Sequence, residues 1–504
     1  MTIAVASLNS CNLGYDIGIT SDVTPLLSQS LSSAQLSIFV GSINLFSLFG
    51  ALISPFVSDR YGRRKTFLYS GFIFLSGCLL QAVSGSFVTL ILGRMVLGIG
   101  IGLGLAIDPI YISEVSPKEL RGQLVTCSEI SINIGILSGF IVGFFLEGLG
   151  ENVGWRVMVG IGAFLPLVLI VLILAGFMPE SPRWLVAKGK LNEAREVLRQ
   201  LNYKSYGDSN GEGEEELVDE LMEKITINIA EERNYYGGRD EVGISGGTSS
   251  GRVPWSTFWH PPPFLKRMLI VGALIASTQQ LTGIDGIQYY MNIMLEASGI
   301  ASRRQSFGIV ILLGIFKLSA VIFAAPRIDH HGRRFMVLLS LSIMILGLLL
   351  IAINLSEDIG AWVSVSGLLI FFTGFSIGLG PVCWLVPSEI FPNRIRAKSV
   401  AFCTIVNRLS ATLVSSTVLP LSAIFGWGGY YFLLAAINAA FLVLNYKILP
   451  ETKEKSLEQM LAFFKDATTS AQEEEQGTEL VTAYDLERID EDSDTNRRET
   501  ETSI

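Results

Sequence analysis

Charged residues are scarce in this sequence. Only 16% of its 504 residues are Asp, Glu, Lys or Arg, whereas half are hydrophobic. A soluble domain carries about 25% charged residues, so this composition argues against a soluble multi-domain enzyme. Nor do Lys and Arg gather into a basic face for nucleic acid. The formal net charge of -9 comes from the acidic stretch after residue 451, which we interpret as a solvated tail rather than as a clue to the substrate.

Histidine and cysteine are also few. The three histidines, His260, His330 and His331, fall in predicted loops, so the sequence indicates no zinc site. The five cysteines lie mostly in apolar runs and form no Cys-x-x-Cys pair. This pattern is typical of small buried hydrophobic residues rather than of disulfides or metal ligands. Because no nucleophile–base pair or metal cluster is visible either, we expect neither an enzyme nor a cofactor.

Long apolar runs are what the sequence has in abundance. A helix needs about 20 apolar residues to cross a bilayer, and we find about twelve such runs. They span residues 1–26, 36–57, 66–84, 88–111, 122–146, 156–177, 267–293, 305–326, 335–354, 361–386, 397–422 and 428–449. We do not expect the first to be a signal peptide, because it lacks a charged leader and carries Asp16. The sequence therefore predicts an all-α membrane protein with twelve transmembrane helices.

Three landmarks occur twice, in the same order. They are Asp-x-x-Gly-Arg-Arg at 59–64 and 329–334, a Glu and an Arg with six residues between them at Glu114/Arg121 and Glu389/Arg396, and Pro-Glu-Ser at 179–181 against Pro-Glu-Thr at 450–452. A single charged loop would be an ordinary anchor at the membrane surface. A repeat with matched spacing instead indicates two copies of one membrane unit, as in large transporters.

The repeat divides the chain into four parts. We expect two pseudo-symmetric six-helix bundles, at 1–179 and 267–450, joined by a cytoplasmic linker at 180–266. Apolar residues recur at a helical period between 188 and 201, so the linker is predicted to be partly helical. Its later part is acidic and rich in Gly and Ser, and we expect it to be disordered. The tail at 451–504 is predicted to be mostly disordered as well.

Lys and Arg also predict the orientation. They are enriched in the loops at 58–65, 112–121, 327–334 and 393–398, and absent from alternate loops. If the enriched loops are cytoplasmic, both termini are cytoplasmic too. Arg303 and Arg304 are the main exceptions, on the outer side. We expect the plasma membrane, with a vacuolar or other internal membrane as the alternative.

Several ionisable residues fall inside the predicted spans. Such a group costs at least a few kcal/mol unless it is paired or solvated, so each is a functional candidate. They are Asp16, Arg94, Asp108, Glu129, Asp285, Lys317 and Arg408. For Asp108 and Arg408 a structural ion pair or a snorkelling side chain is an equal alternative. An aspartate that can exchange an arginine for a proton is a proton-coupling device, and Asp16 with Arg94 is our candidate for that device.

Amides cluster in the seventh run. Gln279, Gln280 and Gln288 offer both donors and acceptors, which a polyhydroxylated ligand requires. Trp384 follows Gly380-Pro381 and offers an apolar face for the C–H side of a sugar ring. A helix broken at Gly-Pro would place it near the middle of the membrane. The alternative for the amides is that they bind one helix to another.

These residues resemble those of the sugar porters of the major facilitator superfamily. The matching segments are Gly14-Tyr15-Asp16, the two Asp-x-x-Gly-Arg-Arg motifs, Gly93-Arg94, residues 109–117, Pro179–Trp184, Gln279-Gln280-x-x-Gly283-Ile284, Gly380–Trp384, Ser388–Pro392, Arg396 and Pro450-Glu-Thr. The resemblance implies a central sugar site between two bundles and alternating access. Acids at Asp16 and Glu129 are similar to those of plant-type polyol and monosaccharide proton symporters. Asp22, in Thr20-Ser21-Asp22, and Asp108 depart from the family pattern.

The resemblance also assigns roles to residues. The implied cytoplasmic salt bridges that latch the outward-facing state involve Asp59, Arg63, Glu114, Arg121, Glu180, Arg333, Glu389 and Arg396. The implied sugar site is lined by Glu129, Gln279, Gln280, Asp285, Tyr289, Lys317, Trp384 and Asn407.

We thus expect a proton-coupled symporter of monosaccharides or polyols. A facilitator that moves sugar down its gradient is the main alternative, and a non-transporting sugar sensor that signals through its tails is a further one. The expected partners are the sugar or polyol, protons and the lipid bilayer. Because both halves of the path lie in one chain, we expect a monomeric transport unit.

Overall fold

Every element of the described part of the chain is a helix. The computed structural model describes residues 2–116, 121–202, 215, 218–227, 258, 261–300, 302–357, 359–453, 455 and 459–464. The elements are α1 (Thr2–Leu27), α2 (Ser33–Tyr61), α3 (Arg63–Ala82), α4 (Phe87–Val115), α5 (Arg121–Leu146), α6 (Glu151–Ile161), α7 (Phe164–Leu174), α8 (Pro182–Ala187), α9 (Leu191–Asn202), α12 (Pro263–Leu281), α13 (Ile284–Tyr289), α14 (Met291–Ala297), α15 (Arg303–His331), α16 (Arg333–Glu357), α17 (Ala361–Ile377), α18 (Leu379–Ile390) and α19 (Asn393–Ile448).

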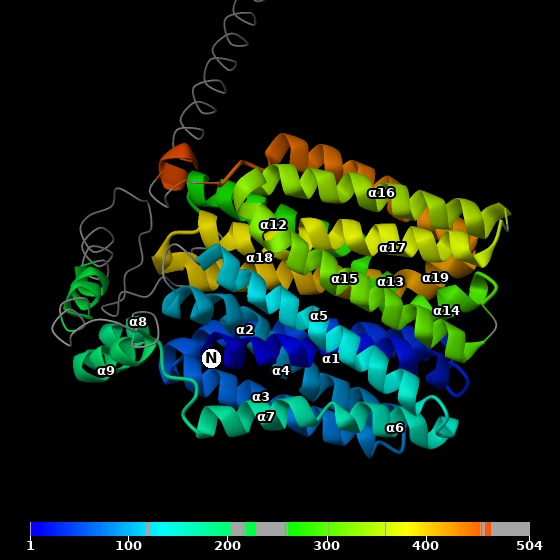
Figure 1. Cartoon of the computed structure of the whole chain (residues 1–504), viewed down its shortest axis with the longest axis horizontal. Helices are drawn as coiled ribbons and strands as arrows, with labels where there is room; N and C mark the ends of the chain where they lie inside the picture. The colour runs from blue at the N-terminus through cyan, green and yellow to red at the C-terminus, as the bar shows by residue number, and fades with distance from the viewer. Residues whose placement is uncertain are drawn as a thin grey trace, which may run out of the picture.

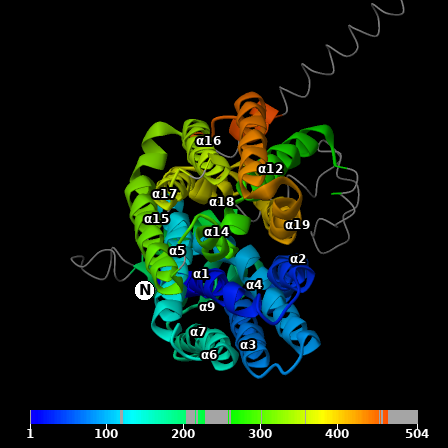
Figure 2. The ribbon, with the colours of Figure 1, turned by 90° about the vertical axis from the view of Figure 1, so that its right-hand side faces the viewer.

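These helices confirm the predicted fold of twelve spans. Within the described residues, each half has six spans: α1 to α5 and the broken pair α6–α7 in the first, and α12 to α19 in the second. Eight helical stretches of this part are long and apolar enough to cross a membrane by composition alone. The spanning helices lie roughly parallel, with the first half below the second in Figure 1. Viewed from one end in Figure 2, α1, α5 and α14 lie near the centre.

Several spans are broken, and two breaks help to shape the centre of the molecule. Between α12 and α13 the chain turns at Gly283, whose φ of 97° favours glycine. Between α17 and α18 the break lies at Gly378, two residues before the Gly380-Pro381 pair at which the sequence predicts it. Pro381 lies in the first turn of α18, where its missing N–H leaves no hydrogen bond unmade. The break thus falls where a new helix can start without cost.

Close packing of α1 on α5 brings the first half together. A Cβ atom on Gly14 would lie 2.0 Å from the carbonyl oxygen of Ile132, and one on Gly18 would lie 2.3 Å from that of Ile136. Only glycine permits two helix backbones to approach this closely. Helix α1 also lies at the interface with the second half, where it contacts α13 and α14. Further contacts between the halves include those of α2 with α19, of α5 with α15 and α18, and of α4 with α18 and α19.

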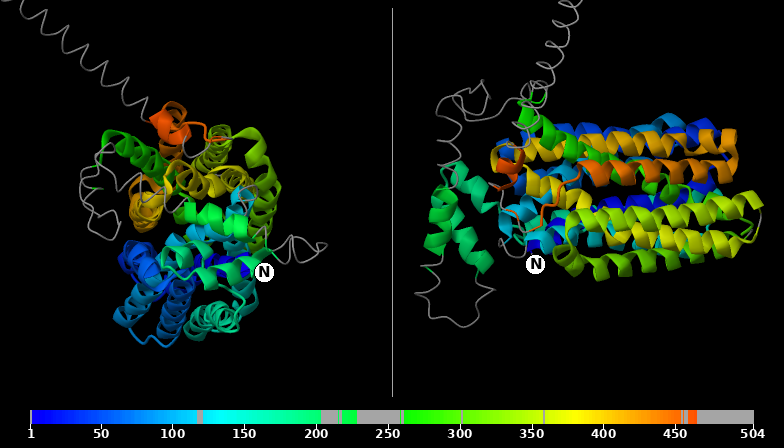
Figure 3. Two further views of the ribbon diagram at one scale, coloured as in Figure 1. Left: turned by 90° about the vertical axis from the view of Figure 1, so that its left-hand side faces the viewer. Right: turned by 90° about the horizontal axis from the view of Figure 1, so that it is seen from above.

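The linker helices lie beyond one end of the spans. Figure 3 shows α8 and α9 outside the bundle on the side of the N-terminus, and we call this side the linker end and the opposite side the far end. Apolar side chains of α8, α9 and residues 218–227 form a small buried cluster of their own, which includes Leu185, Leu198 and Met222. The predicted helix at 188–201 corresponds to α9. The segment 228–257 and the tail after 464 lie outside the described residues, as do the predictions for them.

Candidate functional site

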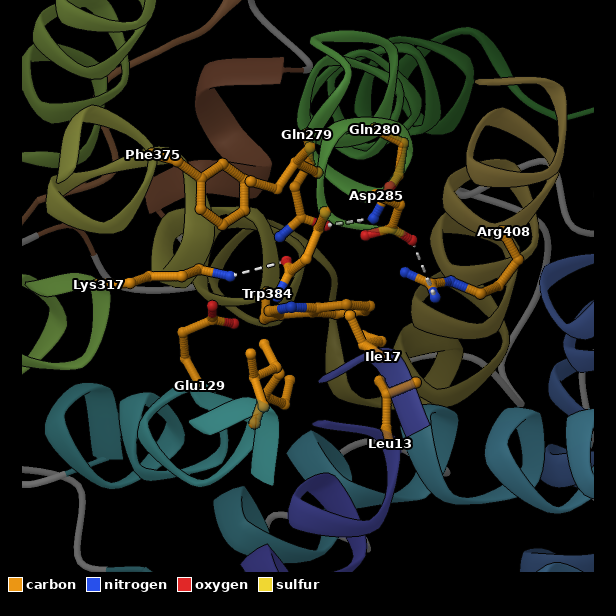
Figure 4. A pocket seen from close by; sticks show the side chains of 14 residues that line it. Leu13, Ile17, Glu129, Gln279, Gln280, Asp285, Lys317, Phe375, Trp384 and Arg408 are labelled. Carbon is orange, nitrogen blue, oxygen red and sulfur yellow. Dashed lines mark hydrogen bonds and ion pairs between the residues drawn. The ribbon is translucent and has the colours of Figure 1, made fainter. Parts of the chain in front are cut away.

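A cavity lies between the two halves, in a space of about 410 Å³ that includes open solvent. Aliphatic side chains of α1 and α5 form one wall, and polar side chains of the second half form the other (Figure 4). Six of the eight residues predicted for substrate binding line it, namely Glu129, Gln279, Gln280, Asp285, Lys317 and Trp384. Trp384 extends into the middle of the space in Figure 4. The cavity thus combines an apolar wall, an aromatic ring and many hydrogen-bonding groups.

Four charged side chains line the cavity, two of each sign. Arg408 Nη1 lies 4.0 Å from Asp285 Oδ2. With its amide oriented to suit its neighbours, Gln280 donates to Asp285 Oδ2 at 3.2 Å and accepts from Arg408 Nη2 at 3.0 Å. Lys317 and Glu129 lie on the opposite side of the cavity from that ion pair (Figure 4). The cavity is therefore polar without a net charge, which suits a neutral ligand.

The amides are held in place by neighbouring groups. Gln279 Nε2 donates to the carbonyl oxygen of Gly380 at 3.1 Å, and Asn407 Nδ2 donates to Gln279 Oε1 at 2.8 Å. Gln288 Oε1 accepts from Lys317 Nζ at 3.1 Å. Fixed amides of this kind are preorganised, so a ligand does not have to order them on binding.

Two residues of the predicted sugar site do not line the cavity. Asn407 is fully buried and contacts the lining residues Gln279 and Arg408 instead of the open space. Tyr289 is buried as well, and its hydroxyl has no hydrogen-bond partner in the described part of the chain. Both lie in the layer that packs around the lining residues.

Asp16 and Arg94 form a buried ion pair next to the cavity. Arg94 Nη1 lies 3.0 Å from both carboxylate oxygens of Asp16, and its Nη2 donates to Thr20 Oγ1 at 2.8 Å. The guanidinium also lies over the Phe39 ring, 4.0 Å from its centroid. Only 1% of Arg94 is exposed. The residue after Asp16, Ile17, lines the cavity, so α1 connects the ion pair directly to it.

Asp108 also binds α1, nearer the linker end. Its carboxyl accepts from Ser10 Oγ at 2.5 Å and from Asn9 Nδ2 at 3.2 Å. The residue is 2% exposed, and within the described residues it has no ion-pair partner. In the described structure neutral donors thus satisfy the Asp108 carboxyl, and no ion pair is formed.

At the linker end the internal repeat is visible as matching geometry. Arg63 Nη2 lies 2.8 Å from Glu114 Oε1, and Arg333 Nη2 lies 2.7 Å from Glu389 Oε1. Asp59 is a weaker partner of Arg63, at 3.6 Å. Each ion pair joins helix ends within one half, so neither crosses between the halves.

Two further residues of the predicted salt-bridge set can be placed only in part. Arg396 is buried, and its Nε donates to the carbonyl oxygen of Phe391 at 3.2 Å. The side chain of Arg121 lies outside the described residues.

Glu180 corrects the predicted salt-bridge set, because it forms no ion pair within 4 Å in the described structure. Its carboxylate instead accepts from the backbone N–H groups of Arg63, at 2.7 Å, and Arg64, at 3.2 Å. The first N–H groups of a helix have no partner within it and attract an anion, so Glu180 caps the start of α3. Burial raises the pKa of Glu180, while the N–H groups of Ser181, Arg63 and Arg64 oppose that rise. Glu451 caps α16 in the same way.

We expect Glu180→Ala to destabilise the protein, since it leaves buried N–H groups without an acceptor. Loss of a helix cap costs about 1 kcal/mol, and unpaired buried donors add to that. The thermal unfolding midpoint of the purified protein measures the effect and should fall. Glu223→Ala, on an exposed helical position of the linker, is the control that should leave the midpoint unchanged. An unchanged midpoint in Glu180→Ala would contradict the capping role.

Some residues of the site were missed or undervalued by sequence reasoning. Arg408 stands out as a charge in an apolar run, but only the structure places it against Asp285 and the cavity. Asn44 accepts from Arg408 Nη1 at 3.1 Å across the two halves. The available signal for Asn44 was a single amide inside the apolar run 36–57, which is too common to be specific.

Comparison with known proteins agrees with this architecture. The family model described as "Sugar (and other) transporter" matches residues 2–464. The chain belongs to the sugar transporter family. It is therefore a multi-pass membrane transporter and not an enzyme.

Individual relatives cover most of the chain. It is 36% identical over 466 residues to "Probable polyol transporter 4" of Arabidopsis thaliana, which covers 91% of this chain and 84% of that protein. It is 34% identical over 471 residues to "Polyol transporter 5" of the same plant, covering 91% and 85%. These lengths include both bundles of this sugar transporter.

A solved structure confirms the fold. The proton:xylose symporter XylE bound to 6-bromo-6-deoxy-D-glucose matches with a TM-score of 0.76 at 24% identity, covering 92% of this chain and 98% of that one. The xylose transporter XylE from E. coli in a partially occluded inward open conformation matches with a TM-score of 0.74 at 23% identity, covering 90% and 99%. This chain therefore has the twelve-span fold of the major facilitator superfamily.

Proposed function

We propose that this sugar transporter is a proton-coupled symporter of monosaccharides or polyols that works by alternating access. The observation that carries the proposal is the buried ion pair of Asp16 with Arg94 beside the cavity. A carboxylate that can be neutralised by an arginine or by a proton links protonation to the position of its helix. The similarity to polyol transporters and to a proton:xylose symporter supports the same substrate class and coupling.

The cavity suits a neutral polyhydroxylated ligand. Amides and ionised groups supply donors and acceptors on one side, which hydroxyl groups can satisfy in both directions. Trp384, Phe375 and the aliphatic wall of α1 and α5 supply apolar surface for the C–H face of such a ligand. We propose that Gln279, Gln280 and Asp285 bind hydroxyl groups directly, while Asn407 positions the amides.

We propose that coupling acts through α1. When a proton neutralises Asp16, Arg94 keeps Thr20 as its partner but loses its charged partner. The part of α1 that lines the cavity can then move relative to α4. Because Leu13 and Ile17 of α1 line the cavity, the movement would change their contacts with the ligand. A proton and a substrate would thereby favour the same conformational change.

The ion pairs at the linker end have a different proposed role. Each of them, Arg63 with Glu114 and Arg333 with Glu389, fixes helix ends within one half. We propose that they stabilise the state that is closed at this end by a few kcal/mol, which is enough to bias a two-state equilibrium.

We also propose that the linker end is cytoplasmic, because its loops carry most of the Lys and Arg. Both chain termini are then cytoplasmic and the far end is extracellular, in a plasma membrane. One chain is the proposed transport unit.

The test is uptake of a labelled panel of sugars and polyols in cells that lack their own carriers, with and without a protonophore. Concentrative uptake that collapses with the protonophore is the expected result, and it names the substrate as well. Uptake that equilibrates and ignores the protonophore would make the protein a facilitator. No uptake of any compound by protein at the cell surface would contradict transport and favour a sensor.

A further inference from the structure

Asp22 joins the two halves at the far end of the molecule. It lies six residues beyond Asp16 on α1, about 1.7 helical turns, and is completely buried. Its Oδ1 accepts a 2.7 Å hydrogen bond from Nδ2 of Asn292 on α14. Asn292 also donates to the backbone oxygen of Ser21 at 3.1 Å, and its own Oδ1 accepts from Ser306 of α15 at 2.6 Å. The network therefore ties α1 of the first half to α14 and α15 of the second.

The carboxyl group of Asp22 has no cationic partner. Its second oxygen, Oδ2, is buried without any hydrogen bond in the described structure. The titratable or charged residues on and next to the elements around it include Tyr15 and Asp16 of α1, Glu129 and Glu147 in and after α5, Asp285, Tyr289 and Tyr290 in and after α13, Glu296 of α14, and Arg303, Arg304 and Lys317 of α15. Asp22 makes neither an ion pair nor a hydrogen bond with any of them, since Asn292 is its hydrogen-bond partner. The groups in direct contact with the Asp22 carboxyl are thus uncharged: the amide of Asn292 and the closely packed helices around it.

Gly143 on α5 provides the space for this acid. A Cβ atom at that position would lie 1.9 Å from Asp22 Oδ2. The carboxyl is therefore enclosed by α5 of its own half and by α14 of the other half. It can reach water only if the halves separate at the far end.

Closure of this contact must change the charge of Asp22. A buried carboxylate without a cation costs far more free energy than the neutral acid, whereas water stabilises the carboxylate once the contact opens. We propose that Asp22 is a second proton-binding site, which is occupied when the two halves close at the far end and is vacated when they separate. This proposal depends on the proposed function in one respect, namely that the far end is extracellular.

The proton on Asp22 does not cross the membrane, unlike the proton that we propose Asp16 carries. Asp22 meets water from the far end alone, so it takes up and releases its proton on the same side of the membrane. It contributes nothing to the number of protons moved per substrate. It does make the closed state more favourable as the external pH falls, since the closed state binds one more proton than the open state.

The test is a distance measurement across the far end. Labels are attached at Gln29 and Ala297, exposed positions of the first and second half, in the Asp16→Asn background so that the coupling acid does not titrate. Between about pH 5 and pH 9 the closed-to-open ratio should fall with rising pH, by as much as about tenfold per pH unit for one linked proton. Asp22→Asn and Asp22→Ser should both remove this dependence.

Ser21→Ala is the matched control, because it removes a neutral hydroxyl from the same network. It should keep the pH dependence. An unchanged dependence in both Asp22 variants would overturn the proposal. So would a proton-to-substrate ratio that falls by one in Asp22→Asn relative to the unsubstituted protein. The distance measurement needs no transport, so a failure of symport and a failure of this site are distinguishable.

Discussion

Accumulation of substrate against its gradient is expected to disappear in Asp16→Asn. The asparagine keeps the shape of the side chain but can neither bind a proton nor form an ion pair with Arg94. The transporter then has no proton-linked switch next to the cavity, and the proton gradient can do no work on the substrate. The steady-state ratio of internal to external substrate should fall to about one, the value at which no driving force remains. Uptake into proteoliposomes with an imposed pH gradient measures this ratio.

Exchange separates loss of coupling from loss of folding. Asp16→Asn should still exchange labelled for unlabelled substrate, since the residues that line the cavity are intact. Glu147→Gln, the same kind of change at a half-buried position near the far end of α5, is the matched control and should accumulate substrate normally. Accumulation that persists in Asp16→Asn would reduce the Asp16–Arg94 pair to a structural role.

The fold was predictable from the sequence because its signals are strong and local. Each span needs only a long apolar run, and the doubled Asp-x-x-Gly-Arg-Arg motif shows where the two halves correspond. The glycines Gly62 and Gly332 in these motifs have φ values of 97° and 86°, which explains why each motif contains a glycine between two spans. Local rules of this kind do not depend on the rest of the chain.

Side-chain partners were predictable only where residue types leave little choice. An acid in the first span and an arginine in the fourth are groups of opposite charge that lipid cannot solvate, which favours a pair, and the structure brings Asp16 and Arg94 together. Glu180 has the same charge, but its partner is a helix start rather than an arginine, and sequence alone does not distinguish these two uses of a carboxylate. Asp22 shows a third use. In the sequence, Asp22 is only a departure from a family motif. The packing of Gly143 and Asn292 around it shows that its carboxyl is buried without a cation.

The second large effect is expected at Gln280. This side chain lines the cavity and bridges Asp285 and Arg408 through its amide. Gln280→Ala removes a side chain that we propose binds substrate hydroxyl groups, and it leaves two charged groups less well satisfied. Loss of hydrogen bonds to polar or charged groups costs about 1–3 kcal/mol, so substrate affinity should fall about 5- to 150-fold. Equilibrium binding of the labelled substrate to purified protein measures the change.

A buried amide away from the cavity provides the comparison. Gln81 on α3 is fully buried, and its Nε2 donates to the carbonyl oxygen of Gly77 at 3.4 Å. Gln81→Ala should lower stability but leave substrate affinity unchanged. Equal affinities in Gln280→Ala and the unsubstituted protein would mean that this amide serves only the Asp285–Arg408 pair. The substrate would then be bound by the remaining groups of the cavity. Among them is Gln279, whose amide is fixed by hydrogen bonds with Asn407 and Gly380.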